Sequence, residues 1–250
     1  MPAPLTVVIP TLNEASQIAD CVRGVAWADE VIVADGGSSD RTPDVAHSAG
    51  ATVLQGPWTT IAAQRNGAIA AAKHEWILAV DADERVGADL AREIAAVIAD
   101  PAHEAYAVRR RNLYLGRTIS HAGWGSDWVV RVFKRGRRFV EHRVHEHLER
   151  STEVGRLRAR LDHVPYRDLS HHLAKLDRYA AWGARDLADR GRRARLTDLL
   201  LRPPVRFLRM YLLQLGVLDG WHGVVLCGMS AVSVFMKYAR LWELQQRPDA

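Results

Sequence analysis

Two aspartates that follow a short apolar run are the first candidates for chemistry. Asp81 and Asp83 come directly after Trp76–Val80, a segment typical of a buried strand. Two carboxylates on one tight turn can hold a hard divalent cation, and Mg²⁺ or Mn²⁺ then completes its octahedron with the oxygens of a diphosphate. Acidic residues after a strand also cap helices, and the turn alone does not separate these two functions.

Polar residues also follow two other apolar runs. Asp35 precedes a Gly-Gly-Ser-Ser turn, where its carboxylate could accept a hydrogen bond from a ribose or a nucleobase. The same turn is typical of a helix start, with Ser39 or Asp40 as the cap, and both readings can hold together. Thr11 and Glu14 end the first apolar run. Because parallel strands present their carboxyl ends at one edge of a sheet, we expect these three loops to converge.

Short apolar runs alternate with amphipathic stretches over the first hundred residues, and this alternation predicts β-α units around a mainly parallel sheet. The predicted strands are Leu5–Ile9, Glu30–Ala34, Thr52–Leu54 and Trp76–Val80. The predicted helices are Ala15–Val25, Thr42–Ala49, Thr60–Ala72 and Ala88–Ala99.

The residue pattern changes in the later part of the chain. Residues 104–149 are strand-like, rich in aromatic and basic side chains, and from residue 169 onward the pattern is helical. We expect a catalytic domain over 1–165, with a nucleotide-sugar half (1–100) and an acceptor half (101–165), followed by an amphipathic helical region over 166–250. The apolar stretch Val224–Met236 is too short to span a bilayer, and its basic and aromatic flanks favour the membrane interface instead. A packed helical subdomain or an oligomer interface is the alternative.

Composition limits the function classes. The chain has 250 residues, 48% hydrophobic content and a formal net charge of +5, which fits a folded basic protein rather than a disordered one. Its two cysteines form no disulfide framework or metal-binding pair, and no signal peptide precedes the first apolar run, so a cytoplasmic location is expected. Arginine clusters attract anionic lipid, phosphate or nucleic acid without choosing among them.

Three motifs in this order resemble glycosyltransferase family 2, whose members have the GT-A fold. They are Val8–Glu14, Ala34–Thr42 and Trp76–Glu84. The resemblance implies an α/β, GT-A type nucleotide-binding fold with a mixed, mainly parallel sheet, followed here by the C-terminal amphipathic helical region. It also implies a nucleotide-sugar donor and a divalent cation, Mg²⁺ or Mn²⁺.

The resemblance assigns roles to single residues. Nucleotide-sugar binding falls to Thr11, Glu14, Asp35, Arg65, Asn66 and Asp81, and metal binding falls to Asp83 with help from Asp81. Arg65 and Asn66 belong to a segment similar to one that borders the nucleotide in the family, although a surface helix would use the same residue types. Asp127 matches the family's acid in a D-x-x-x-R element and is the proposed base. Arg131, in that element, neutralises phosphate or orients Asp127; a structural Asp-Arg pair is the alternative.

Features of the later chain are similar to one branch of the family, the lipopolysaccharide core β-1,4-glucosyltransferases. Trp124, His145 and Glu146 are the secondary, acceptor-side residues in this comparison, together with the tail over 206–243. The branch implies an inverting transfer of glucose from UDP-glucose to an inner-core heptose by an enzyme on the inner face of the cytoplasmic membrane. We reject a zinc site over 141–147, because the spacing is not HExxH and a strand would separate the ligands.

Rival functions remain open at this point. A polyprenyl-phosphate sugar transferase would share the three N-terminal motifs. Nucleotidyltransferases are disfavoured because no G-x-G-T-R-type loop follows the first predicted strand, and dehydrogenases because no GxGxxG follows any predicted strand. A nucleic-acid-binding protein is disfavoured because the arginine clusters lack interleaved aromatic side chains and a recognition motif. We therefore expect a UDP-sugar donor, a glycolipid acceptor, peripheral membrane association and no nucleic acid, with the oligomeric state undetermined.

Overall fold

The computed structural model describes residues 3–58, 60–140, 148 and 153–246. The chain forms two compact units, Met1–Arg111 with Trp128–His163 and Asn112–Asp127 with Val164–Ala250. Segment 112–127, expected in the acceptor half of 1–165, therefore belongs to the same unit as the C-terminal helices. His145 and Glu146 lie outside the described residues.

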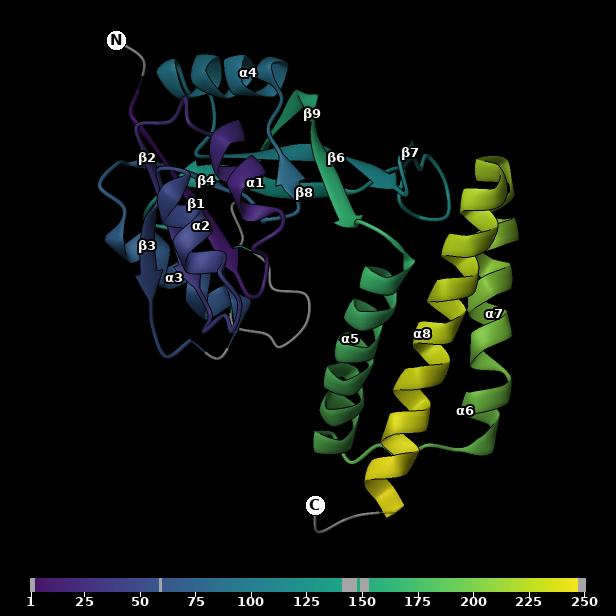
Figure 1. Cartoon of the computed structure of the whole chain (residues 1–250). Helices are drawn as coiled ribbons and strands as arrows, with labels where there is room; N and C mark the ends of the chain where they lie inside the picture. The colour runs from purple at the N-terminus through teal and green to yellow at the C-terminus, as the bar shows by residue number, and fades with distance from the viewer. Residues whose placement is uncertain (1–2, 59, 141–147, 149–152, 247–250) are drawn as a thin grey trace. The chain divides into compact units, whose positions relative to one another are not determined.

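The first unit is built on a mixed sheet with the strand order β3-β2-β1-β4-β8-β6-β9-β5 (Figure 1). Its strands are β1 (Leu5–Thr11), β2 (Glu30–Asp35), β3 (Thr52–Gln55), β4 (Trp76–Ala79), β5 (Glu84–Arg85), β6 (Ala105–Tyr114), β8 (Trp128–Lys134) and β9 (Gly155–Tyr166). Strands β1 to β4 pair in parallel, whereas β8 is antiparallel to both β4 and β6. The last residues of β6 and β9 belong to the second unit.

Helices cover both faces of the parallel part of this sheet. They are α1 (Ile18–Gly24), α2 (Thr42–Ser48), α3 (Ile61–Ala71) and α4 (Ala88–Ala99). Every residue of β1 is buried, and its side chains alternate between two cores: Val7 and Ile9 pack with α1, α2 and α4, and Val8 packs with α3. A strand buried on both faces reads as a continuous Val/Ile run, and this is why the first strand was visible in the sequence.

The strand order places a topological switch at β1. The chain runs outward from β1 to β2 and β3, and then returns on the other side of β1 to form β4. In open α/β sheets, ligands bind in the crevice at the carboxyl ends of the strands where this reversal occurs. The loops after β1 and β4 flank that point.

The second unit is mainly helical. Its elements are β7 (Arg117–Thr118), α5 (Leu169–Asp189), α6 (Leu196–Leu200), α7 (Arg202–Leu208), a π-helical turn η1 (Arg209–Leu213), a 3-10 turn η2 (Gly216–Asp219) and α8 (Gly220–Gln246). Helix α8 lies beside α5 and α7 (Figure 1). Asp168 begins α5 because its carboxylate accepts from the backbone N–H of His171 at 2.7 Å.

The C-terminal helix is longer than the apolar stretch Val224–Met236 suggested. The run Gly216–Gln246 is long and apolar enough to cross a membrane by length and composition. The length argument against a span therefore does not apply to the whole helix. One such helix is weak support for a span by itself, and 22% of its most apolar stretch is buried inside the protein.

Candidate active site

The carboxyl ends of β1 and β2 meet as expected. Thr11 lies opposite Asp35 in the parallel register, and its hydroxyl donates to the Asp35 carboxylate at 3.4 Å. Both residues are buried. The Asp35 carboxylate also accepts from the backbone N–H groups of Gly37 and Ser38, at 3.1 and 3.0 Å, so it orders the turn that follows β2.

The first glycine of this turn leaves room for a side chain of α3. A Cβ added to Gly36 would lie 1.9 Å from the amide nitrogen of Gln64, a buried residue of α3. That amide donates to the Thr11 carbonyl at 3.3 Å, and the Gly36 N–H donates to the same carbonyl at 2.9 Å. Three segments far apart in the sequence are thereby joined at one point of the sheet edge.

The loop after β1 is tied to the loop after β2. Asn13 has a positive φ of 58°, a conformation that asparagine tolerates better than most residues. Its side-chain carbonyl accepts from the Ser39 N–H at 2.8 Å, and the Glu14 N–H donates to the Thr42 hydroxyl at 2.8 Å. Glu14 is half-buried, and its carboxylate accepts from Gln17 at 3.2 Å.

The acidic turn after β4 contains a buried ion network. Nη2 of Arg131 donates to Asp81 at 2.5 Å and to Glu84 at 2.6 Å, and Arg65 donates to the other oxygen of Asp81. Arg110 lies 3.5 Å from Glu84. Glu84 is fully buried, and Arg65 and Arg131 are nearly so. The turn is therefore a charge-compensated structure rather than a loose acidic loop.

The network changes the acidities of its members. Burial raises the pKa of Glu84, an effect that the Arg131 charge only partly offsets. Burial acts in the same direction on Asp81, but Arg131 and Arg65 outweigh it and hold the pKa of that carboxyl well below its usual range. Burial tends to lower the pKa of Arg131, whereas Asp81 and Glu84 raise it and keep the guanidinium charged.

Asp83 has a different neighbour. Its carboxylate lies 3.6 Å from Nε2 of His163, and both side chains are mostly buried. His163 comes from β9 and stands opposite Glu84 in the β5–β9 register. A carboxylate and an imidazole are a donor pair that suits a divalent transition metal such as Mn²⁺. Within the described part of the chain, no group of three or more His, Cys, Asp and Glu side chains is arranged to hold a metal ion.

Arg65 and Asn66 lie side by side on α3 but have different contacts. The Arg65 guanidinium reaches Asp81 and also lies over the Phe139 ring, 4.7 Å from its centroid. The Asn66 amide donates to the Phe139 carbonyl at 2.9 Å and accepts from the Phe139 N–H at 2.8 Å. Asn66 thus fixes the chain after β8, while Arg65 belongs to the acidic turn.

Trp124 and Asp127 belong to the second unit, and both are half-buried. The Trp124 ring packs edge-on against Tyr114, with centroids 6.1 Å apart. The segment that carries both residues is held by Asp219 of η2, which accepts from the backbone N–H groups of Ser120 and His121 at 3.2 and 3.0 Å. The element that bears the proposed base is therefore anchored to the C-terminal helical region.

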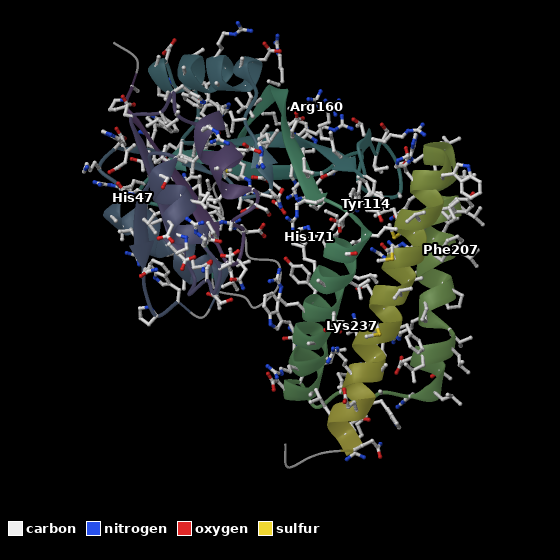
Figure 2. The ribbon with its side chains drawn as sticks, in the orientation of Figure 1. His47, Tyr114, Arg160, His171, Phe207 and Lys237 are labelled. Carbon is white, nitrogen blue, oxygen red and sulfur yellow. The ribbon has the colours of Figure 1, made fainter. Side chains whose placement is uncertain are left out.

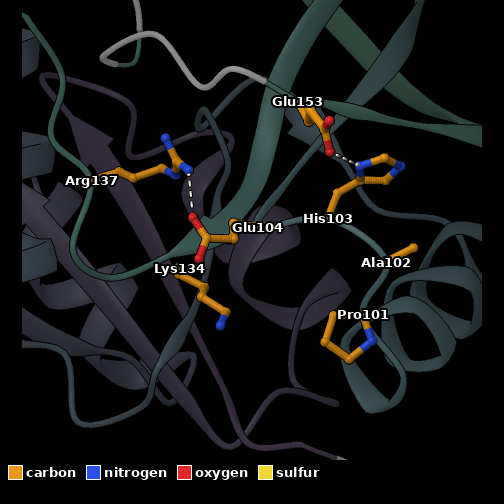
Figure 3. Close-up of a pocket in the computed structure, with 7 residues that line it drawn as sticks. All are labelled: Pro101, Ala102, His103, Glu104, Lys134, Arg137 and Glu153. Atoms are coloured by element: carbon orange, nitrogen blue, oxygen red, sulfur yellow. Dashed lines mark hydrogen bonds and ion pairs between the residues drawn. The ribbon is translucent and has the colours of Figure 1, made fainter.

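A surface pocket of about 260 Å³ lies elsewhere in the first unit (Figure 3). It contains none of the predicted site residues. Its walls carry an Arg137–Glu104 ion pair at 2.8 Å and a His103–Glu153 contact at 4.0 Å. Lys134, which also lines it, pairs with Trp76 at the start of β4, so the pocket lies at the opposite edge of the sheet from Asp81.

Comparison with known proteins identifies the class. Glycosyl transferase family 2 matches residues 6–159, so the chain belongs to this family and is a glycosyltransferase. The lipopolysaccharide core biosynthesis glycosyltransferase LpsC of Rhizobium meliloti (strain 1021) is 26% identical over 98% of this chain and 96% of its own length. An uncharacterized glycosyltransferase of Rickettsia bellii (strain RML369-C) is 25% identical over 96% and 86%.

A solved structure agrees with this fold. S. aureus TarS 1-349 superposes with a TM-score of 0.52 at 15% identity, over 98% of this chain and 92% of that one. Glucosyl-3-phosphoglycerate synthase from Mycobacterium tuberculosis, in complex with Mn²⁺, UDP and glucosyl-3-phosphoglycerate, gives a TM-score of 0.39 at 21% identity, over 44% of each chain. The fold is of the GT-A type, as the motifs predicted.

Sequence reasoning missed three members of the site. Glu84 and Arg110 were given no role, and His163 was not considered. Arg131 was predicted to act on phosphate or on Asp127, whereas its described hydrogen bonds go to Asp81 and Glu84. The sequence carries a partial signal for Glu84, because it is the fourth residue of the turn that begins at Asp81. It carries none for His163, because nothing in the sequence indicates that β9 pairs with β5.

Proposed function

We propose that this family 2 glycosyltransferase moves a hexose, glucose from UDP-glucose, onto a heptose of the lipopolysaccharide inner core. The acidic turn after β4 carries the donor part of this proposal. Arg131, Arg65 and Arg110 offset the negative charge of Asp81 and Glu84, which would otherwise repel a diphosphate. The similarity to LpsC, a lipopolysaccharide core biosynthesis glycosyltransferase, over nearly the full length supports the acceptor class.

The residues present fit a divalent cation, Mg²⁺ or Mn²⁺. Asp83 would hold it with Asp81 helping through its charge, and His163 would be a second protein ligand for Mn²⁺. Such ions are commonly bound by one or two protein carboxylates together with substrate phosphates. When bound, the ion would supply electrostatic stabilisation of the departing nucleoside diphosphate.

The protein side chains have separable tasks in this proposal. Thr11, Glu14 and Asp35 shape the nucleotide pocket, with Arg65 fixing Asp81 at its border. Asp127 takes the proton from the acceptor hydroxyl, a step for which general-base help is worth about 10²- to 10⁴-fold. In-line attack on the α-linked donor then gives a β-glycoside with inversion.

The acceptor explains the proposed location. A glycolipid in the inner leaflet of the cytoplasmic membrane requires an enzyme on its cytoplasmic face, held by peripheral contact. The basic, apolar C-terminal region supports this arrangement, because it suits an anionic lipid surface. The chain can act alone or as an oligomer on that surface.

Donor binding tests the proposal directly. We would measure binding and slow hydrolysis of UDP-, GDP- and CMP-sugars with Mn²⁺, Mg²⁺ or EDTA, for the wild type and Asp83→Asn. Asp89→Asn is the matched control, because Asp89 is an exposed residue of α4 in the same unit. We expect metal-dependent binding of one UDP-sugar that Asp83→Asn loses and Asp89→Asn keeps.

Two results would contradict the proposal in different ways. Indifference to all nucleotide sugars and to metal would mean that the acidic turn is structural only. A donor-active enzyme whose Asp127→Asn variant keeps most of its transfer activity would point to a polyprenyl-phosphate acceptor, because a phosphate oxygen needs no strong base.

A further inference from the structure

The second unit exposes an unusual amount of apolar surface between α6 and the start of α8. Eleven exposed large apolar side chains form what we call the apolar face: Leu196, Leu200, Leu201, Val205, Leu208, Leu212, Leu213, Leu215, Val217, Leu218 and Trp221. Leu213 is 80% exposed and Trp221 is 83% exposed. Contiguous apolar exposure within one short segment marks an interaction surface.

The exposed residues follow helical spacing. Leu201, Val205, Leu208 and Leu212 recur at intervals of four and three through α7 and η1, so they lie on one side of the helix. An ordinary surface helix directs such a stripe toward the core, whereas this stripe is solvent-exposed.

The opposite side of the same helix is already packed. Met210 is buried, and Phe207 and Tyr211 are partly buried, in a core that also contains Tyr114 and Cys227. Figure 2 shows Phe207 on this segment. One side of this helix is therefore packed in the core of the second unit, and the leucines on its other side are exposed although the helix is packed.

Basic side chains lie beside the apolar stripe. Arg202, Arg206 and Arg209 occupy neighbouring positions on the helix, each one residue after a member of the stripe, and all three are exposed. Residues 190–218 contain seven arginines and one aspartate, which gives a net charge of +6. Long arginine stems can lie along an apolar surface while their charges reach lipid phosphates.

Helix α8 is held by protein contacts along one side. Its Tyr238 and Leu241 are buried against neighbouring helices, and its Arg240 pairs with Asp177 of α5. Lys237 points from α8 toward α5, where its side chain approaches Gly183 (Figure 2). These contacts hold one side of α8 in the bundle, while Val232, Phe235 and Trp242 of the same helix are exposed.

We propose that the apolar face docks the protein on an anionic bilayer without crossing it, an inference that rests on the proposed glycolipid acceptor. The leucines enter the acyl boundary, and Arg206 and Arg209 bind lipid phosphates at its rim. Helix α8 stays within the bundle and supports the docking helix from behind.

Vesicle flotation tests this proposal. The full chain is mixed with phosphatidylcholine vesicles with and without phosphatidylglycerol. We expect wild-type protein to float with the anionic vesicles and to be released by alkaline carbonate. The double variant Leu213→Glu/Leu218→Glu is expected to bind about 100-fold more weakly, because two leucines are lost from the apolar layer and two like charges are added. Arg206→Gln/Arg209→Gln is expected to bind about 30-fold more weakly at low salt.

The matched control is Leu173→Glu. Leu173 is an exposed leucine of α5 in the same unit, so the change is identical in type but lies off the apolar face. This variant is expected to bind as the wild type does. Equal urea-unfolding midpoints for all variants would exclude a folding defect, since each replaced side chain is exposed.

Four outcomes would overturn the inference. The first two are that the wild type floats with no vesicle, or that Leu173→Glu weakens vesicle binding as much as the double variant does. The other two are that carbonate cannot extract the bound protein, which would mean that α8 spans the bilayer, or that Leu213→Glu/Leu218→Glu dissociates a dimer in solution without changing vesicle binding. UDP-sugar binding, measured on the same preparations, depends on Asp83 rather than on this face. Wild-type protein that binds a UDP-sugar but floats with no vesicle would therefore refute the docking proposal alone.

Discussion

Removing Arg131 is expected to destabilise the first unit strongly. The Arg131→Met change removes the guanidinium that donates to Glu84 at 2.6 Å, although Glu84 is 0% exposed. Asp81 then keeps its hydrogen bond from Arg65. Breaking a buried ion pair by removing one member costs about 3–5 kcal/mol. Glu84→Gln removes the charge but keeps an acceptor, so we expect a loss of about 1–3 kcal/mol.

A double-mutant cycle measures the interaction energy between Arg131 and Glu84. In Arg131→Met/Glu84→Gln the uncompensated carboxylate is gone, so the loss should be smaller than the sum of the single losses by about 1–3 kcal/mol. Urea unfolding followed by circular dichroism measures the free energy of each variant. The exposed pair Arg92–Asp89 of α4 is the control, and Arg92→Met should cost under about 0.5 kcal/mol.

The same variants test the link to function. If the network holds the acidic turn in place, Arg131→Met should also weaken metal-dependent UDP binding at temperatures where the protein is still folded. A loss below about 1 kcal/mol for Arg131→Met, or additivity within about 0.5 kcal/mol, would refute the reasoning, since either result means that the buried charges do not depend on one another.

Three further predictions concern other parts of the molecule. Gly223→Ala should destabilise the protein by about 1–3 kcal/mol, because the new Cβ would lie 1.9 Å from the Gly216 carbonyl oxygen. Gly228→Ala should instead stabilise α8 by about 0.5–1 kcal/mol, because its new Cβ would have no neighbouring atom within 4 Å. Thermal unfolding compares the two variants. Burial and nearby cationic side chains lower the pKa of His172 from 6.5 to about 4, so between these values the unfolded chain binds a proton that the folded protein does not. Stability should then fall as the pH drops through that window, by up to about 3 kcal/mol, and His172→Phe should reduce the slope of the unfolding midpoint against pH. Chelation with EDTA should abolish the rise in melting temperature that UDP causes in the presence of Mn²⁺, and a rise that survives chelation would contradict a metal-bridged diphosphate.

The parallel part of the fold was predictable because its signals are local. Strands β1 and β2 are continuous Val/Ile runs, and α4 has the predicted bounds Ala88–Ala99. Strand β9 was missed although its sequence carries a strand signal, because Leu157, Ala159 and Leu161 face the core and alternate with arginines.

The site was predictable only in part. Asp81 and Asp83 stand out because they follow a buried strand directly. The partners of Asp81 come from positions 65 and 131, and only the fold brings these together. The same holds for His163, which reaches Asp83 through an antiparallel pairing that no local motif announces.

The hydrogen bonds from Ser120 and His121 to Asp219 have a consequence for synthesis on the ribosome. They join residues 99 and 98 positions apart. At about 5–20 residues per second, the segment that carries Asp127 is translated roughly 5–20 s before its anchor. The strands β1 to β4 gain their neighbours long before that time. A ribosome stalled shortly before residue 219 is therefore expected to display a folded sheet with its acidic turn, while the segment 112–127 is still accessible to a protease.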